Sequence, residues 1–206
     1  MTDAELPDTP RQRGRPRDPE LEPRVFDAAL RLYGEEGWAG FSFETIARES
    51  GVGKNALYRR WPDKGALLRE VLETRWVSVD RIDTGNFAED LRALCRMLFA
   101  DLAGPLGAVG LQLQLDVARH PVVADAVHGY TDEVQRSARA IVRRAVARGE
   151  FATETPTTLV LDLVSGALAS HVRATPPALR DNMHANAESW IEQLVGLICR
   201  GVGAPG

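Results

Sequence analysis

Apolar residues recur at helical spacing along most of this chain, and that pattern predicts helices throughout. In the first helix, one face carries Leu21, Val25, Ala29, Leu32 and Tyr33. We expect this helix to end near residue 37, a glycine, because glycine is favoured just beyond a helix C-terminus. Alternating runs rich in Val, Ile and Thr, which would indicate strands, are scarce. The pattern therefore predicts an all-α fold.

Two short helices joined by a tight turn are predicted next. Ser42 is a suitable N-cap for the first of them, and Ser50-Gly51 ends it. The second runs from about residue 53 to residue 60 and stops before Pro62, because the residue preceding a proline is pushed out of the helical region. Asp63 then caps a longer fourth helix, which we expect to reach about residue 79. A pair of short helices around a glycine turn is typical of a helix-turn-helix.

The remainder of the chain is predicted as longer helices separated by glycine and proline. Phe87, Leu91, Leu94, Leu98 and Leu102 define one clear apolar face. The next residues predict further helices over 106–118, 122–148, 157–174 and 184–200.

Charge is distributed unevenly along the 206 residues, whose formal net charge is -4. An evenly acidic surface would argue against a nucleic-acid partner. However, the run from Arg11 to Arg17 contains no acidic residue, and Lys54, Arg59, Arg60 and Lys64 form a second basic cluster. Local clusters matter more for DNA than the net charge, since salt makes the attraction short-ranged.

Several functional classes have no support in the sequence. No stretch of about 18 uncharged apolar residues predicts a membrane span. Cys95 and Cys199 lack motif spacing, which argues against a disulfide framework or zinc site and fits a reducing cytoplasm. No nucleophile elbow, phosphate-binding loop or metalloprotease motif is present, so we expect neither an enzyme nor a bound cofactor or metal. The four histidines stand at unrelated spacings and are expected on the surface or in packing: His120, His128, His171 and His184.

The second helix of the predicted helix-turn-helix carries side chains suited to DNA. Leu57 anchors it inward, while Lys54, Asn55, Tyr58 and Arg59 point outward at helical spacing. Lysine and asparagine can read base edges, whereas tyrosine and arginine can reach phosphates. This helix is therefore the expected recognition helix.

The segment from Phe43 to Leu67 strongly resembles the TetR family of repressors. Ile46-Ala47, Gly51-Val52, Leu57-Tyr58 and Lys64 stand at the spacing typical of that family. The resemblance is specific over residues 20–75 and only architectural beyond them. Trp61 replaces the usual phenylalanine, and Ser42-Phe43 replaces the more frequent threonine-rich entry.

The resemblance implies roles for individual residues. It implies that Thr45, Tyr58 and Lys64 contact phosphates and that Gly53, Lys54 and Asn55 meet bases. The departure at the entry leaves Ser42 as a cap and a candidate phosphate ligand. The full predicted DNA-binding set, including the basic residues around the motif, is Arg13, Arg15, Arg17, Ser42, Thr45, Gly53, Lys54, Asn55, Tyr58, Arg59, Arg60 and Lys64.

Residues 1–18 are predicted as a flexible basic arm. The stretch Arg13-Gly14-Arg15-Pro16-Arg17 looks like the core of an AT-hook, and such a segment fits the narrow minor groove of A·T-rich DNA. A solvated basic tail that adds only nonspecific phosphate attraction is the alternative.

The resemblance also implies a helix-turn-helix domain over 19–65 and a ligand-binding and dimerisation domain over 66–206. Gln112 and Asp116 are one turn apart in an otherwise apolar helix, so they either face solvent or orient a ligand. The ligand candidates are Trp76, Phe87, Leu91, Leu94, Cys95, Leu98, Phe99, Gln112, Leu115, Asp116, Tyr130 and Val134, although most of the apolar ones equally fit a helical core.

The last two helices are the expected dimer interface. Small residues four apart in the segment 164–170 allow helices to approach closely, and the final helix carries an apolar stripe. Packing of these faces within one subunit is the alternative. The interface candidates are Leu163, Gly166, Ala167, Ser170, Trp190, Ile191, Leu194, Leu197 and Ile198.

The sequence thus favours a cytoplasmic, homodimeric repressor, without a membrane partner, that binds a palindromic operator in double-stranded DNA. A small, largely apolar effector would release it. The fourth helix, from Lys64 past Trp76, is the expected lever between the two sites. The alternatives are a ligand-independent activator or architectural DNA-binding dimer, and a helical enzyme or binding protein with a vestigial helix-turn-helix.

Overall fold

The computed structural model describes residues 20–75, 79, 81–151 and 154–203. Within these ranges the regular structure is entirely helical, which confirms the all-α prediction. The elements in chain order are α1 (Leu21–Gly40), α2 (Phe43–Ser50), α3 (Lys54–Arg60), α4 (Lys64–Arg75), α5 (Phe87–Ala103), α6 (Leu106–Val117), α7 (Pro121–Ala147), α8 (Thr157–Ala174), the 3-10 helix η1 (Pro177–Leu179), α9 (Arg180–Ala185) and α10 (Ala187–Gly203).

Local side-chain hydrogen bonds define the helix-turn-helix. The Ser42 hydroxyl accepts the Thr45 main-chain N–H at 3.2 Å and so caps α2. At the other end, Gly51 adopts a left-handed conformation with φ 68°. The Ser50 hydroxyl donates to the Ile46 carbonyl at 2.7 Å and accepts the Val52 N–H at 3.3 Å. The cap at Ser42 and the helix end at Ser50-Gly51 are as predicted, and the Ser50 hydroxyl additionally holds the turn.

A break near the end of α1 sets the course of the chain into α2. Gly37 has φ 62° and ψ -163°, a conformation open essentially to glycine alone. The helical segment continues to Gly40 beyond this break, so the predicted end at residue 37 is a kink. The kink directs the main-chain N–H of Trp38 out of the hydrogen-bond pattern of the helix. The N–H can therefore donate to a group on another element.

Apolar side chains form two separate cores. The first joins α1 to α4 with the inner face of α6 and the beginning of α7, and includes Leu57, Leu72, Val109 and Val123. The second joins α5, the later part of α7, α8, α9 and α10, and includes Leu91 and Ile141. The predicted DNA-binding module, α1 to α3, therefore shares its core with α4, which begins beside the expected boundary at residue 65, and this core also packs on α6 and α7.

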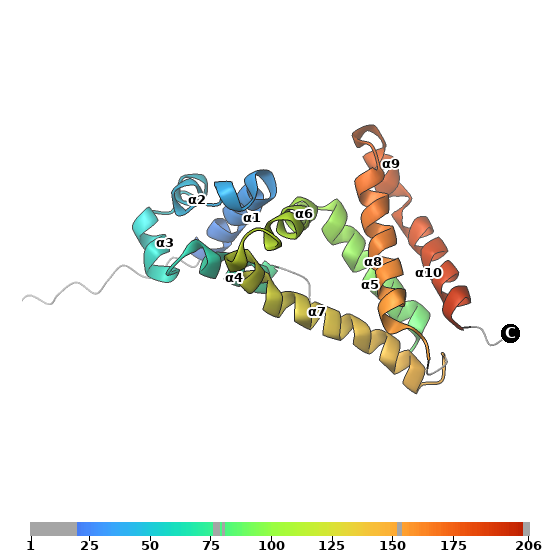
Figure 1. Ribbon diagram of the computed structural model, residues 1–206. Helices are drawn as coiled ribbons and strands as arrows, with labels where there is room; N and C mark the ends of the chain where they lie inside the picture. Colours follow the sequence, from blue (N-terminus) through green and yellow to red (C-terminus); the bar gives the residue numbers. More distant parts are fainter. Residues whose placement is uncertain (1–19, 76–78, 80, 152–153, 204–206) are drawn as a thin grey trace, which may run out of the picture.

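These two cores stand at opposite ends of an open arrangement of helices (Figure 1). α6 and α7 leave the DNA-binding module side by side and diverge, and α5 with α8 and α10 spans the distance between their far ends. α6, α7 and the α5–α8–α10 group thus form three sides of a triangle. This layout places α6 between the DNA-binding module and the space enclosed by the triangle.

The C-terminal region differs from its prediction in one detail. The sequence predicted a single final helix over 184–200, whereas α9 and α10 are separate helices that meet at Asn186. Met183 on α9 is buried in the second core. Residue 184, where the sequence analysis began the final helix, therefore belongs to the separate short helix α9.

No single helix in the described ranges has the length and apolarity needed to cross a membrane. By length and composition alone, α5 and α6 qualify only as a broken pair, with a bend of 83° between them.

Candidate DNA-binding surface and ligand cavity

The predicted recognition helix α3 presents its polar side chains to the outside. Leu57 is fully buried and fixes the helix against the first core, while Lys54, Asn55, Tyr58 and Arg59 are exposed. Gly53 directly precedes this helix as its N-cap and is also exposed. The helix therefore offers two potential base-reading and two potential phosphate-binding side chains on one accessible surface.

The predicted phosphate-binding residues of α2 and α3 lie close together. The Tyr58 side chain is 54% exposed, and its ring stands edge-on to Phe43 with centroids 4.8 Å apart. The Thr45 and Ser42 hydroxyl oxygens are 3.0 Å apart. The ammonium of Lys54 lies 3.4 Å from the carboxylate of Glu44, an exposed pair that contributes little to stability and leaves Lys54 able to move.

Arg60 is turned back toward its own module. Its guanidinium pairs with Glu22 at 2.8 Å and with Glu70 at 3.0 Å. The indole N–H of the neighbouring Trp61 donates to the same Glu70 at 2.8 Å. The larger side chain at position 61 thus fills the apolar site and gains a hydrogen bond there. Arg60 thus makes two exposed ion pairs within the module, and its contact with DNA stays a prediction.

Lys64 also makes contacts inside the module. Its ammonium donates to the Trp38 carbonyl at 2.9 Å and lies 3.9 Å from the centre of the Trp38 ring. Burial lowers the pKa of Lys64, an effect opposed by the negative charge of Asp116. The structure therefore ties this residue to the kink of α1, and a phosphate contact would require it to leave Trp38.

Four predicted site residues lie outside the described ranges. They are the arm residues Arg13, Arg15 and Arg17 and the ligand candidate Trp76.

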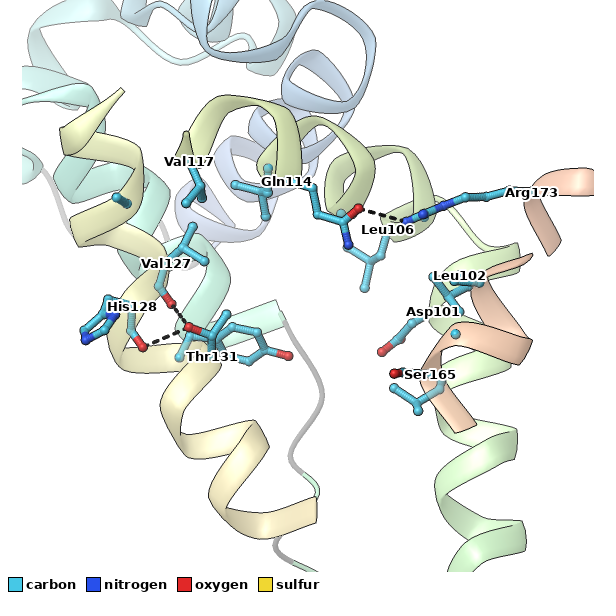
Figure 2. Close-up of a pocket in the computed structure, with 18 residues that line it drawn as sticks. Asp101, Leu102, Leu106, Gln114, Val117, Val127, His128, Thr131, Ser165 and Arg173 are labelled. Atoms are coloured by element: carbon cyan, nitrogen blue, oxygen red, sulfur yellow. Dashed lines mark hydrogen bonds between the residues drawn. The ribbon is translucent and has the colours of Figure 1, made fainter. Parts of the chain in front are cut away.

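A cavity of about 780 Å³ occupies the space between α5, α6, α7 and α8 (Figure 2). Its wall is mostly apolar, but Asp101 of α5, Gln114 of α6 and Arg173 of α8 also line it. Arg173 reaches across from α8 and donates to the Gln114 side-chain oxygen at 3.2 Å. The lining residues are Leu98, Asp101, Leu102, Leu106, Gly107, Gly110, Leu113, Gln114, Val117, Ala124, Val127, His128, Tyr130, Thr131, Ser165, Gly166, Ala169 and Arg173.

Few of the predicted ligand residues belong to this wall. Leu98 and Tyr130 line the cavity. Val134 packs at the edge of the second core, and Leu115 is exposed on the surface. The remaining apolar candidates of α5 are buried within the second core, as expected for helical core positions: Phe87, Leu91, Leu94, Cys95 and Phe99. Burial accordingly raises the pKa of the Cys95 thiol to about 12.

The two polar candidates of α6 face the DNA-binding module instead of the cavity. Asp116 accepts the Tyr33 hydroxyl at 3.0 Å and the Trp38 main-chain N–H at 2.8 Å. A side chain added at Gly37 would meet the Gln112 amide oxygen and the Asp116 carboxylate, each at 3.2 Å. Burial, followed by the hydrogen bond and negative charge of Asp116, strongly raises the pKa of Tyr33. Both residues therefore contribute to the contact between α6 and the kink of α1.

One face of α6 lines the cavity, and the sequence analysis did not predict it. Gly107, Gly110, Gln114 and Val117 follow one another at intervals of three and four residues, so they share a side of α6. Gly110 presents no side chain to the cavity, whereas a Cβ at Gly107 would collide with the main-chain carbonyl of Leu102, so that glycine allows α6 to start close to the end of α5. Asp101 was likewise detectable, one turn after Leu98 on the apolar face of α5.

The predicted dimer residues divide among the surface, the second core and the cavity wall, which includes Gly166. Leu163 of α8 is 50% exposed and Leu197 of α10 is 62% exposed, although both are leucines. Gly166 and Ser170 are also exposed, whereas Ala167, Trp190 and Leu194 are half-buried. Ile191 and Ile198 are buried within their own chain. The exposed apolar stripe is thus narrower than the sequence predicted.

Comparison with known proteins agrees with this layout. Residues 25–71 match the family described as "Bacterial regulatory proteins, tetR family", and residues 81–194 match "Tetracyclin repressor-like, C-terminal domain". The chain belongs to the TetR family of transcriptional regulators. The HTH-type transcriptional regulator AqdR of Rhodococcus erythropolis is 30% identical over 173 residues, covering 84% of this chain and 82% of AqdR.

Solved structures share the fold of this TetR-family chain. A putative TetR-family regulator from Mesorhizobium loti superimposes with a TM-score of 0.67 at 19% identity, covering 92% of this chain and 100% of that one. The regulator FadR from Bacillus subtilis, solved in complex with stearoyl-CoA, gives 0.67 at 16% identity, covering 86% of this chain and 97% of FadR. The all-helical architecture, with an N-terminal DNA-binding module and a larger helical body, is therefore that of the family.

Proposed function

We propose that this regulator is a dimeric repressor that a small, largely apolar ligand releases from a palindromic operator. The observation that carries the proposal is the position of α6. One side of this helix lines the cavity, and the other side packs on α1 through Asp116. A ligand that displaces α6 would therefore move the DNA-binding module.

Coupling through α6 differs from the expected role of the fourth helix. In the described part of α4, which ends at Arg75, no residue lines the cavity. A two-fold reader must hold its recognition helices about 34–36 Å apart to enter successive major grooves. A shift of α6 that tilts α1 changes this separation, and by linkage DNA then weakens ligand binding by the same factor.

Variants of the recognition helix test the DNA-binding role. The probe is the DNA upstream of the protein's own gene, and the readout is fluorescence anisotropy followed by selection from a randomised site. Lys54→Ala and Asn55→Ala should alter the ranking of sites by about 1–3 kcal/mol for each lost base contact. Tyr58→Phe should weaken all sites alike, since phosphates carry no sequence information.

The outcome of that selection decides whether Lys54 and Asn55 read the bases. If the Lys54 and Asn55 variants keep the parent's ranking of sites, α3 does not read the bases through these two side chains. Absence of specific binding by the parent to any selected site would contradict the proposed function as a whole.

Exposed leucines test the dimer. Leu197→Glu and Leu163→Glu should convert the protein to folded monomers, because each places a charge in the proposed interface without disturbing the core of the protomer. Leu115→Glu, an equally exposed leucine on α6, is the matched control. Sedimentation showing dimers for both α8 and α10 variants would place the interface elsewhere.

A further inference from the structure

The cavity contains one carboxylate without a cationic partner. Asp101 extends from α5 into the cavity (Figure 2), and within the described part of the chain no basic side chain pairs with it. Burial is the cause that raises the pKa of Asp101, to about 6, so the group is partly removed from water and still ionised at neutral pH. A partly dehydrated charge with no counter-ion is unfavourable, and a ligand of opposite charge would relieve it.

We propose that the ligand of this cavity is an amphiphilic organic cation whose ammonium or related head group pairs with Asp101. This inference rests on the proposed role of the cavity as the effector site. The apolar body of such a ligand would lie along Leu102, Leu106, Leu113 and Val127, which line the same space. The cavity volume of about 780 Å³ is within the range of small-molecule sites.

A second residue near the acid supports a cationic head group. Tyr130 of α7 lines the cavity, and burial together with the negative charge of Asp101 raises the pKa of its hydroxyl. The phenol is therefore neutral at any pH at which the protein is handled. Aromatic rings attract ammonium groups through their electron-rich faces, so an acid and a tyrosine in one apolar cavity suit a cation.

The basic residue of the wall is placed less favourably for an anionic ligand. Arg173 is an exposed residue of α8 that donates to Gln114 at 3.2 Å. Figure 2 shows it crossing from α8 to α6, away from the side chains of α7. An anion at Arg173 would have to replace the bond to Gln114 and share a low-polarity space with Asp101. Repulsion from that carboxylate makes the anion the weaker candidate.

Three ligands with the same alkyl chain separate these possibilities. Decyltrimethylammonium carries a fixed positive charge, decyl sulfate carries a negative charge, and decanol is neutral. Calorimetry on the full-length parent protein at pH 7.5, below the micelle concentrations, should show that the ammonium compound binds about tenfold more tightly than either of the others. Asp101→Asn should abolish this preference and leave decanol binding unchanged.

Matched variants exclude indirect effects. Asp132→Asn removes an exposed acid of α7 that pairs with His128 at 3.4 Å and does not line the cavity, so the preference for the ammonium compound should persist. Arg173→Gln should leave ammonium binding unchanged or strengthen it. Circular dichroism checks that each variant is folded.

The pH profile gives a further readout. Between pH 7.5 and pH 5 the parent should lose several-fold of its ammonium affinity as Asp101 takes up a proton, whereas Asp101→Asn should show no such loss. The other ionisable groups that line the cavity are Tyr130 and His128 of α7 and Arg173 of α8. His128→Gln should retain the pH dependence if Asp101 causes it.

The results separate the ligand class from the proposed function. Equal binding of all three compounds, no ammonium binding, or tighter binding of decyl sulfate that is lost in Arg173→Gln would each overturn the cation site. Ammonium binding at Asp101 that leaves DNA affinity unchanged in anisotropy would uphold the cation site and contradict ligand release. Normal DNA binding by the parent without any ammonium binding would retain a DNA regulator and reject the cation site.

Discussion

The two sides of α6 differ sharply. On the side facing α1 the helices approach so closely that a Cβ added at Gly34 would lie 3.3 Å from that of Ala108. On the other side Gly107 and Gly110 border a cavity of about 780 Å³. One helix is thus tightly packed toward the DNA-binding module and loosely packed toward the body. A closely packed contact transmits displacement, and an open space admits the ligand that causes it.

Two buried or half-buried acids show the same contrast. Asp116 accepts hydrogen bonds from Tyr33 and Trp38, so its carboxylate has partners at the junction, the contact between α6 and the kink of α1. Asp101 lines the cavity, and burial raises its pKa to about 6. The first acid therefore stabilises the folded chain, whereas the second is held at a cost that a ligand can offset.

The largest effect is expected at the junction. Asp116→Ala removes the acceptor of the buried Tyr33 hydroxyl and of the partly buried Trp38 N–H, and we expect it to destabilise the protein by about 3 kcal/mol in urea unfolding. Gln114→Ala, two residues away on the cavity side, should change stability by less than about 0.5 kcal/mol. Equal losses for the two variants would remove the distinction between the sides of α6.

A matched pair of glycine substitutions probes packing in the same way. A Cβ at Gly65 of α4 would lie 2.5 Å from the Val122 side chain of α7, so Gly65→Ala should cost about 1–2 kcal/mol. Gly129, inside α7, has nothing within 4 Å of an added Cβ, and Gly129→Ala should stabilise by about 0.5–1 kcal/mol.

Relief of the contact tests the cause of the first change. The double variant Gly65→Ala with Val122→Ala should recover most of the loss seen in thermal unfolding. If Gly65→Ala is as stable as the parent, the space between α4 and α7 accommodates a methyl group at position 65, and the close contact with Val122 does not limit stability.

A smaller effect than at Asp116 is expected from the acid of the cavity, and it depends on pH. The pKa of Asp101 is raised in the folded protein, from its ordinary 3.8 to about 6, so ionisation disfavours folding as pH rises through this window. Asp101→Asn should therefore stabilise the ligand-free protein by about 1 kcal/mol at pH 7.5, after allowance for its partial exposure, and not at all near pH 3.5. Unfolding curves at the two pH values measure the difference, and the same gain at both would mean that desolvation of the charge is not responsible.

The helix-turn-helix was predictable because its signals are local. Ser42, Gly51 and Pro62 act on their immediate neighbours through a cap, a left-handed turn and a steric clash. The spacing of apolar residues then places Leu57 inward and Lys54 outward without reference to the rest of the chain. The family pattern spans the same stretch, so the family and the fold class followed from the sequence, and the recognition surface stays a prediction from the same signals.

The cavity was less predictable because helical periodicity identifies an apolar face without naming what covers it. The face of α5 that carries Leu91 and Leu94 proved to be core, while one turn at its end, with Leu98 and Asp101, borders the open space. Likewise, the apolar period of α10 does not distinguish Ile191, buried in its own chain, from Leu197 on the surface.

By itself the sequence determined most of the helices, the caps at Ser42 and Asp63, and the unusual polarity of Gln112 and Asp116 within an apolar helix, and it predicted the recognition surface. Only the tertiary structure decided which way that polarity faces. The kink at Gly37 frees the Trp38 N–H, and Asp116 accepts it from a helix 78 positions further along the chain. A donor removed from water must find an acceptor wherever the packed chain offers one. No local sequence pattern around Trp38 or Asp116 predicts that these two residues form a hydrogen bond.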